Sequence, residues 1–424
     1  AQAVAAGAVA VLTDPAGATG LAAPALVVAD PRQVLGEVAS WVHGRPSEAL
    51  TVLGVTGTNG KTTSAFLLEA GLRAAGRSTG LLGTVVTRIG QDAVPSVRTT
   101  PEATDLHALF AVMRERGVDA VAMEVSSHAL AYGRVDGVRF DVSVFTNLSQ
   151  DHLDFHASME DYFAAKASLF TPARTARGVV NADDQAGRRL LAAAAVPVAS
   201  YGEAGDWRAV EVELRPDGSR FRLLGPGVDV PAAVRLPGAF NVSNAVGALA
   251  ALVTAGVPVE DAVRGIAQLP GVPGRMERVD AGQPFAALVD YAHTPDAVET
   301  LLRTVREVTA GRVIVVLGCG GDRDRGKRPL MGRAAVEGAD LAVLTSDNPR
   351  SEDPLAILAE MQQPGAVVEP DRRAAIALAV AEARPGDTVV VAGKGHETGQ
   401  EAGGVVTPFD DREVLRAALE GVRA

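Results

Sequence analysis

The stretch LGVTGTNGKTT, residues 53–63, decides the fold class of this chain of 424 residues. It follows a buried-strand run at 51–55 and opens an apolar-periodic helix that we expect over 61–75. Backbone N–H groups at such a helix start can bind phosphate, Lys61 can reach the outer phosphates, and Thr62 can hold Mg²⁺. The usual phosphate loop has a further glycine where this chain has valine, so the loop is a shortened form. We therefore predict nucleotide binding, with an ordinary glycine-rich turn as the alternative.

Strands and helices alternate along most of the chain, which predicts an α/β protein with mostly parallel, doubly wound sheets. The segment 206–236 differs, because its short strand-like runs predict an antiparallel insert. The expected strands are 51–55, 118–124, 140–146, 177–180, 286–290, 312–317, 340–345 and 387–391, and the expected helices are 31–43, 61–75, 159–170, 241–255 and 259–267.

The length predicts roughly three domains, at about 150 residues each. Residues 1–45 contain two short apolar runs and one helix, which bury too little surface to fold alone and predict a partial N-terminal α/β domain. Residues 46–270 are expected to form a central domain with the phosphate loop (P-loop), a doubly wound sheet and the insert. The segment GVPGRMERV, punctuated by glycine and proline, opens a third, Rossmann-like α/β domain expected over 271–424.

The composition excludes several classes of protein. The formal net charge of −11, from 40 basic and 51 acidic residues, argues against a general nucleic-acid-binding role. No run reaches the roughly eighteen apolar residues of a membrane span, and the first residues lack the basic region of a signal peptide. The single cysteine, Cys319, excludes an internal disulfide and fits a reducing compartment. Together these features predict a soluble, cytoplasmic protein.

Lysine is rare in this chain. Of the forty basic residues only Lys61, Lys166, Lys327 and Lys394 are lysines, which leaves thirty-six arginines. A lysine that persists against such a bias marks a place where a compact ammonium, or an amine that can lose its proton, is needed. Chance retention is the alternative, but each of the four lies in a segment that is unusual on other grounds.

Acidic and histidine side chains follow two of the expected strands. Glu124 and His128 lie at the carboxyl end of the strand 118–124, where open α/β sheets bind their ligands. His152 and His156 follow the next strand, and on a helix their spacing would place them on one face, as in a zinc pair. A phosphate site instead calls for Mg²⁺ and hard oxygen ligands, and a structural histidine pair is the third interpretation.

Eleven segments, in order along the chain, resemble the Mur ligase family, MurE type. The resemblance runs from about residue 1 to the C-terminus and implies the three-domain Mur ligase architecture. It rests on TGTNGKTT (56–63), RTTPEA (98–103), MEVSSHAL (123–130), TNLSQDHLDFH (146–156), YFAAKASLF (162–170), LPGAFNVSNA (236–245), PGRME (273–277), DYAHTPDA (290–297), GCGGDRDRGKRPLMG (318–332), DNPR (347–350) and GKGHE (393–397).

The resemblance implies that ATP binds in a cleft between the second and third domains, with Arg275 arriving from the third. Asn241 is one of the implied ATP residues, and a helix N-cap is an equally good interpretation of it. The implied ATP-binding residues are Gly57, Thr58, Asn59, Gly60, Lys61, Thr62, Thr63, Asn241, Asn244, Arg275 and Asp290, and the implied catalytic residues are Lys61, Glu124, His152, Lys166 and Arg275.

Two Mg²⁺ ions are implied as well. By resemblance, Thr62 and Glu124 ligate the ion that bridges the ATP phosphates, and His152 ligates a second one. The lysine that matches Lys166 carries a carbamate formed with CO₂, which makes it an anionic oxygen ligand. Arginine could not undergo this change because its guanidinium stays protonated. Without the resemblance, Lys166 would be interpreted as a lysine that extends its ammonium towards solvent.

Two further sets of residues are implied to bind the substrates. The DNPR form is associated with meso-diaminopimelate, whose second carboxylate would pair with Arg350, although a bare DNPR is often a surface turn. Many relatives carry glutamine where this chain has Tyr132. The residues implied for the UDP-sugar peptide are Thr99, Thr100, Ser126 and Arg134, and those for the amino acid are Arg323, Asp347, Asn348, Pro349, Arg350, Gly393 and Glu397.

The implied activity is an ATP-dependent amide ligase of peptidoglycan precursor synthesis. It would add meso-diaminopimelate to the D-Glu of UDP-MurNAc-L-Ala-D-Glu through an acyl phosphate. A ligase that adds L-lysine, a ligase similar to folylpolyglutamate synthase, and a nucleotide-binding module without ligase activity are the alternatives.

Overall fold

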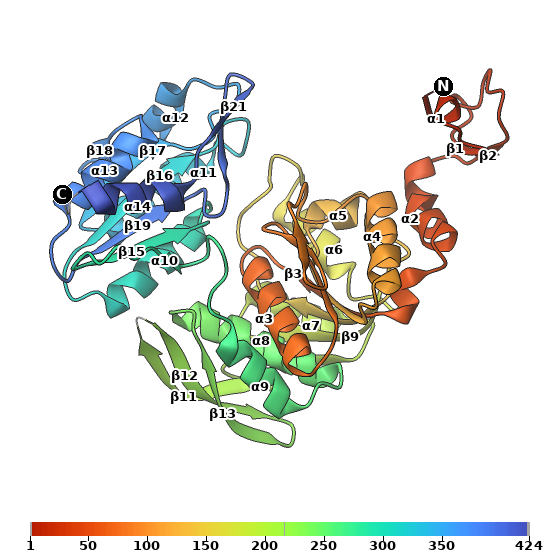
Figure 1. Cartoon of the computed structure of the whole chain (residues 1–424), viewed down its shortest axis with the longest axis horizontal. Coiled ribbons are helices and arrows are strands. Elements are labelled where there is room, and N and C mark those ends of the chain that lie inside the picture. Colours follow the sequence, from red (N-terminus) through yellow and green to blue (C-terminus); the bar gives the residue numbers. More distant parts are fainter. Residues whose placement is uncertain (1, 216, 422–424) are drawn as a thin grey trace.

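The computed structural model describes residues 2–215 and 217–421. The central and C-terminal parts stand side by side, and a small N-terminal part projects from the central one at the end of a helix (Figure 1). In the described residues, no helix is long and apolar enough to cross a membrane.

The central part is built on an eight-stranded sheet with the order β10-β9-β8-β3-β7-β4-β5-β6. The first six of these strands are parallel, and β5 and β6 extend the edge in antiparallel fashion. The expected strands 51–55, 118–124, 140–146 and 177–180 are confirmed as β3, β7, β8 and β9. The strands are β3 (Thr51–Thr56), β4 (Thr79–Leu82), β5 (Thr87–Ile89), β6 (Asp92–Val94), β7 (Ala120–Glu124), β8 (Phe140–Phe145), β9 (Thr175–Asn181) and β10 (Val198–Tyr201).

Helices cover both faces of this sheet. Both faces need a cover because successive side chains of a strand point to opposite faces and apolar side chains occur on both. In β3, Val52 belongs to one core, whereas Leu53 and Val55 belong to the other, where α3 and α8 pack. The expected helices over 61–75, 159–170, 241–255 and 259–267 are confirmed. The helices are α3 (Lys61–Ala74), α4 (Ala103–Glu115), α5 (Ser127–Ala131), α6 (Met159–Ala167), α7 (Gln185–Ala193), α8 (Ala239–Thr254) and α9 (Val259–Gln268).

The expected antiparallel insert is confirmed as the three-stranded sheet β11 (Arg208–Arg215), β12 (Gly218–Gly225) and β13 (Val228–Val234). It packs on α8 and α9, on the side away from the main sheet (Figure 1). The insert therefore closes the core beneath α8 and lies outside the cleft described below.

The C-terminal part contains a six-stranded sheet with the order β14-β15-β19-β16-β17-β18, in which only β14 is antiparallel. The strands expected near 286–290, 312–317, 340–345 and 387–391 are confirmed as β15, β16, β17 and β19. The elements are β14 (Glu277–Arg278), β15 (Ala286–Asp290), α10 (Pro295–Val308), β16 (Val313–Cys319), α11 (Lys327–Gly338), β17 (Leu341–Ser346), α12 (Pro354–Met361), β18 (Val367–Val368), α13 (Arg372–Glu382), β19 (Thr388–Ala392), β20 (Gly399–Ala402), β21 (Val405–Pro408) and α14 (Asp411–Gly421).

The N-terminal part is a short parallel pair followed by a helix. Asp30 caps α2 (Pro31–Val42) by accepting a hydrogen bond from the Arg32 N–H, which confirms the expected helix. This helix packs on α4, and the Ser40 hydroxyl donates to the Gly137 carbonyl at 3.0 Å. The remaining elements are α1 (Gln2–Ala5), β1 (Val11–Thr13), β2 (Ala25–Val27) and the 3-10 helix η1 (Pro46–Ala49).

Candidate active site at the interdomain cleft

The glycine-rich loop between β3 and α3 has a backbone that only glycine adopts readily. Gly57 has φ of +151° and Gly60 has φ of +85°, and an added Cβ at Gly57 would overlap Thr146 Oγ1. The loop is held from β8: the Asn59 N–H donates to Asn147 Oδ1 at 2.9 Å, and Thr146 Oγ1 donates to the Asn59 carbonyl at 2.6 Å. The N-terminus of α3 therefore opens into the cleft with its first N–H groups in a fixed geometry.

The two lysines of the central domain converge on this loop. Lys61 Nζ donates to the Gly57 carbonyl at 2.9 Å and to the Thr58 carbonyl at 2.8 Å. Lys166 Nζ, from α6, donates to the same Gly57 carbonyl at 2.7 Å and lies 4.5 Å from the centre of the Tyr162 ring. Lys166 is only 1% exposed, so the structure excludes a side chain that extends to solvent. Burial, and then the charge of Lys61, lowers the pKa of Lys166 well below its ordinary value.

Glu124, Thr62 and Arg275 form a chain of contacts across the cleft. Thr62 Oγ1 donates to Glu124 Oε2 at 3.1 Å, and Arg275 Nη2 donates to Thr62 Oγ1 at 2.9 Å. The Arg275 guanidinium lies 4.3 Å from the centre of the Tyr291 ring, and its Nε is buried without a hydrogen-bond partner. The second carboxylate oxygen of Glu124 accepts from the Thr84 N–H at 2.7 Å. A hydroxyl, a carboxylate and unused guanidinium donors therefore meet at the start of α3.

His152 lies next to Asp151 and His128, and it is not on a helix. Its φ is +54°, and residues 153–155 form a turn and 156–158 a bend, so His152 and His156 do not share a helical face, although the His156 N–H donates to the His152 carbonyl at 2.9 Å. Asp151 approaches His152 Nε2 at 3.3 Å and His293 Nε2, from the C-terminal domain, at 3.9 Å. Burial lowers the pKa of His152 to about 3 despite the opposing charge of Asp151. Within 2–215 and 217–421, no three His, Cys, Asp or Glu side chains are grouped to hold a metal, so the zinc interpretation has no ligand set.

Asn241 and Asn244 lie in the first and second turns of α8. The N-cap position of this helix is taken by Gly238, so the alternative interpretation of Asn241 as an N-cap is wrong. Asn241 Nδ2 instead donates to the Pro237 carbonyl at 2.8 Å, and its Oδ1 accepts from Asn244 Nδ2 at 3.3 Å. Asn244 Oδ1 faces the phosphate loop, because it lies 2.5 Å from where a Cβ on Gly60 would be.

Most of these residues line one cavity of about 840 Å³ between the central and C-terminal domains. All the implied ATP residues except Gly57 line it, together with the four residues implied for the UDP-sugar peptide. The predicted site residues that line it are Thr58, Asn59, Gly60, Lys61, Thr62, Thr63, Thr99, Thr100, Glu124, Ser126, Arg134, His152, Lys166, Asn241, Asn244, Arg275, Asp290 and Arg323.

Asp290 has a structural role that its place in the cavity wall does not by itself reveal. Its two carboxylate oxygens accept hydrogen bonds from the Met276 N–H at 2.7 Å and the Ala292 N–H at 2.8 Å. Asp290 thus fixes the segment that carries Arg275, which enters the C-terminal domain through β14.

The residues implied for the UDP-sugar peptide lie next to Glu124. Thr99 Oγ1 is 3.0 Å from Thr84 Oγ1, and Thr100 Oγ1 donates to the Glu124 carbonyl at 2.9 Å and accepts from the Ser126 N–H at 3.1 Å. The residues implied for the UDP-sugar peptide therefore share one hydrogen-bonded wall of the cavity with Glu124.

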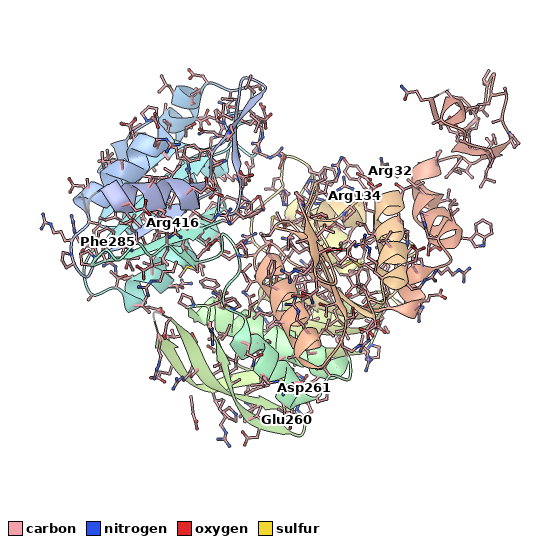
Figure 2. The ribbon with its side chains drawn as sticks, viewed as in Figure 1. Arg32, Arg134, Glu260, Asp261, Phe285 and Arg416 are labelled. Atoms are coloured by element: carbon pink, nitrogen blue, oxygen red, sulfur yellow. The ribbon has the colours of Figure 1, made fainter. Side chains whose placement is uncertain are left out.

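At the outer end of this wall, Arg134 pairs with Glu102 at 2.9 Å. The Tyr132 ring lies 5.4 Å from the Arg134 guanidinium and 5.3 Å from that of Arg32 on α2, and the two arginines approach each other there (Figure 2). Tyr132, which stands where many relatives have glutamine, thus links the cavity rim to the N-terminal part.

The residues implied for the amino acid follow the carboxyl ends of β16, β17 and β19, and of this set only Arg323 lines the cavity. Asp347 and Asn348 are each 8% exposed, so DNPR is not a simple surface turn here. Arg350 has φ of +54°, donates to the Gly321 carbonyl at 2.7 Å and lies 3.6 Å from Glu401. Gly393, with φ of +112°, passes so close to Asp347 that a Cβ there would lie 2.7 Å from Asp347 Oδ2.

The structure adds residues that sequence reasoning missed. Thr84 joins Glu124 to Thr99, and Tyr291 and His293 bring aromatic surface to the cleft from the C-terminal domain. Thr84 follows β4 without a motif of its own. Tyr291 and His293 lie in the segment DYAHTPDA, so that segment could have directed attention to them.

Comparison with known proteins agrees with this arrangement. The Mur ligase middle domain matches residues 55–252, and the Mur ligase glutamate ligase domain matches residues 274–395. A UDP-N-acetylmuramoyl-L-alanyl-D-glutamate--2,6-diaminopimelate ligase from Streptomyces coelicolor is 60% identical, covering 99% of this chain and 86% of its own. Its counterpart from Corynebacterium glutamicum is 49% identical, covering 98% of this chain and 85% of its own.

Solved structures give the same result. A ligase structure with the same printed name as these relatives matches with a TM-score of 0.69 and 35% identity, over 100% of this chain and 88% of its own. A folylpolyglutamate synthase from Mycobacterium tuberculosis matches with a TM-score of 0.67 over 84% of this chain and 91% of its own, but at 20% identity it shows a shared fold alone.

The phosphate loop that faces a second α/β domain across a polar cleft, together with these matches, identifies the chain as an ATP-dependent ligase. The chain belongs to the Mur ligase family within that class. The expected α/β fold class is confirmed with it.

Proposed function

We propose that this chain joins meso-diaminopimelate to the D-Glu of UDP-MurNAc-L-Ala-D-Glu in an ATP-dependent step of peptidoglycan precursor synthesis. The printed names of the relatives support the reaction and its substrates. The observation that carries the proposal is the meeting of Lys61 and Lys166 at the carbonyl of Gly57, in one cavity with Glu124 and Arg275.

Thr62 and Glu124 would hold Mg²⁺ at the ATP phosphates. Their oxygens lie 3.1 Å apart at the start of α3, and a hydroxyl with a carboxylate is a donor set that suits this ion. When bound, the ion supplies positive charge that offsets the charge of the phosphate oxygens. His152 is the residue we assign to a second Mg²⁺.

The first chemical step is the attack of the D-Glu side-chain carboxylate on the γ-phosphorus of ATP. The new carboxyl O–P bond forms as the bond to the β-phosphate oxygen breaks, giving an acyl phosphate and ADP. Two anions must approach each other, so Lys61 and Arg275 stabilise charge on the transferred group. Arg275 has donors available for this, since its buried Nε has no partner among the described residues.

Lys166 fits a carbamate. The step is addition of CO₂ to the unprotonated amine, which forms an N–C bond and releases one proton. Burial and the neighbouring Lys61 favour the unprotonated amine. The resulting anion would lie beside Lys61 at the phosphate loop, where it would offset that lysine's charge and offer oxygen to a metal ion.

The unprotonated amine of the amino acid then attacks the acyl carbon: the C–N bond forms as the C–O bond to phosphate breaks, phosphate leaves with the electrons of that bond, and the nitrogen releases one proton to solvent. The diamino acid keeps a second amino group, as an ammonium, and a second carboxylate at its other end. We assign this non-reacting ammonium to Asp347 and Glu397, and the second carboxylate to Arg350 and Arg323. Of these four residues, Arg323 lines the cavity.

We also propose domain boundaries near 46 and 271 and a cytoplasmic location. The boundaries separate the projecting N-terminal part, the eight-stranded sheet and the six-stranded sheet. A cytoplasmic location suits an enzyme that consumes ATP and whose one cysteine, Cys319, is buried and free.

Coupled phosphate release tests the proposal. Release should require ATP, UDP-MurNAc-L-Ala-D-Glu and meso-diaminopimelate together, and L-lysine should replace the diamino acid poorly. Equal rates with lysine would overturn the Arg350 assignment and favour the lysine-adding alternative. Release that depends on a folate and glutamate would favour the folylpolyglutamate alternative, and nucleotide binding without release would favour a binding module.

A further inference from the structure

The proposed reaction leaves two lysines without a role, Lys327 and Lys394, and Lys394 is the more deeply buried of the two. Lys394 lies two residues after the end of β19 and is 0% exposed, so its ammonium is buried in full. Nζ donates to Asn348 Oδ1 at 3.0 Å and to Glu397 Oε2 at 3.0 Å. Burying an ammonium group costs free energy unless the group is paired and hydrogen-bonded. Asn348 and Glu397 therefore determine where the Lys394 ammonium lies.

The hydrogen bonds around Lys394 orient both partners. Asn348 Oδ1 accepts from Lys394 and from the Glu401 N–H at 3.0 Å, which directs the Asn348 amide nitrogen to the other side. That nitrogen donates to Glu397 Oε2 at 2.8 Å. Glu397 Oε2 therefore receives two donors, one of them charged.

The other acidic oxygens at this place remain open. Among residues 2–215 and 217–421, no donor reaches Glu397 Oε1 or the carboxylate of Asp347. Asp347 is nevertheless 8% exposed, and its Oδ2 lies over Gly393, the neighbour of Lys394. These oxygens are not sealed from solvent, since the Glu397 side chain is 32% exposed, so a ligand's ammonium group can reach them and donate hydrogen bonds to them.

We propose that Lys394 is a positioning residue for the amino-acid substrate: it occupies one oxygen of Glu397 and fixes the amide of Asn348, so that Glu397 Oε1 and Asp347 face the incoming ammonium. This inference rests on the proposed amino-acid site. It also explains why arginine does not stand here, since a planar guanidinium is too large for a fully buried position between these two side chains.

Lys394→Met tests the inference in the full-length protein by steady-state phosphate release. We expect the KM for the amino acid that the wild type uses to rise about ten- to hundredfold, the effect of losing a charged hydrogen bond. The KM for ATP and kcat should stay within about threefold. Lys394→Gln keeps a donor without the charge and should give a smaller rise, and it serves if Lys394→Met unfolds at the assay temperature.

Arg312→Met is the matched control. Arg312 pairs with Asp387 at 3.0 Å where β16 and β19 begin, at the other end of these strands from the amino-acid site. Loss of Arg312 should therefore destabilise the same sheet away from that site. Thermal melting should show destabilisation in both variants, but the KM for the amino acid should rise only in Lys394→Met. An equal rise in both would overturn the inference.

A double-mutant cycle with Glu397→Gln separates positioning from a general structural role. If Lys394 acts through Glu397, adding Lys394→Met to Glu397→Gln should raise the KM by less than about threefold. If the KM increases of the two single variants multiply in the double variant, or if Lys394→Met alone leaves the KM unchanged, the inference is overturned while the proposed function stands. A wild type that releases phosphate with lysine as readily as with diaminopimelate would correct the proposed substrate, and the same cycle would then test Lys394 with lysine. Release that needs no amino acid would overturn both.

Discussion

Arg275→Met should slow the reaction by about 10²- to 10³-fold in kcat, the cost of removing one preorganised donor that faces charge in a transition state. Two features of the structure set this magnitude. The side chain reaches across the cleft to Thr62 Oγ1 at 2.9 Å, and its Nε is buried without a partner, so several donors are free for phosphate. The Tyr291 ring, 4.3 Å away, fixes the guanidinium plane and adds about 0.5–2 kcal/mol of cation–π attraction.

Arg275→Lys separates charge from geometry. A lysine keeps the positive charge but not the planar pair of donors, so we expect a loss of about tenfold in kcat. The assay is ADP release at saturating substrates, with thermal melting to show that each variant is folded. Arg278→Met is the control, because Arg278 lies three residues further along, is mostly exposed and pairs only with Asp280. A kcat of Arg275→Met within threefold of wild type, or an equal loss in Arg278→Met, would refute the reasoning.

Three further predictions concern the loop, the buried lysine and the C-terminal sheet. Gly57→Ala should weaken ATP binding at least tenfold in calorimetry, because the positive φ of Gly57 and the overlap of a Cβ with Thr146 together cost about 1–3 kcal/mol. Adding Thr146→Ala removes the overlap and should recover part of the lost affinity. An unchanged affinity for ATP would contradict a phosphate-binding loop. Lys166→Ala should abolish turnover, and Lys166→Glu, which supplies a carboxylate in place of the carbamate, should restore a measurable part of it. Intact-protein mass spectrometry of the wild type in bicarbonate should show the mass of one added CO₂. An active Lys166→Ala variant would exclude the carbamate. Arg372 forms a fully buried ion pair with Asp411. Arg372→Met leaves the Asp411 carboxylate buried without its partner, so it should lower the unfolding free energy by about 3–5 kcal/mol, whereas the double variant with Asp411→Leu should lower it by much less. Equal losses in denaturant titration would contradict a penalty from the unpaired charge.

Much of the fold could be predicted because buried parallel strands leave a clear signal. The runs that became β3, β16 and β19 are nearly continuous and apolar, as strands covered on both faces are. β5 and the edge strand β6 were missed because each has three residues and all three residues of β6 are exposed, so neither length nor apolar content distinguishes them from a loop.

The candidate site was predictable where a motif fixed both the residue and its place. Lys61 begins a predicted helix, Glu124 ends a predicted strand and Lys166 lies inside a predicted helix. The carboxyl ends of parallel strands meet at one edge of the sheet. Thr84 and His293 gain their contacts only when distant segments meet, so no local pattern announces them.

Two local interpretations were wrong for identifiable reasons. The spacing of His152 and His156 matches a helix face, but the His152 N–H is taken by the Asp151 carboxylate at 2.9 Å and the backbone turns instead. Asn241 lies inside α8 rather than at its cap because the helix begins earlier, after Gly238 with φ of +98°. The roles of the site residues remain predictions.

The transfer of a heavy oxygen isotope tests the central claim most directly, namely that the cavity brings ATP and a carboxylate together for phosphorylation. UDP-MurNAc-L-Ala-D-Glu labelled in its D-Glu side-chain carboxylate should pass one labelled oxygen to each phosphate released. Mass spectrometry of that phosphate would show the label if an acyl phosphate forms beside Lys61 and Lys166. Unlabelled phosphate, released at the rate of peptide-bond formation, would contradict the account.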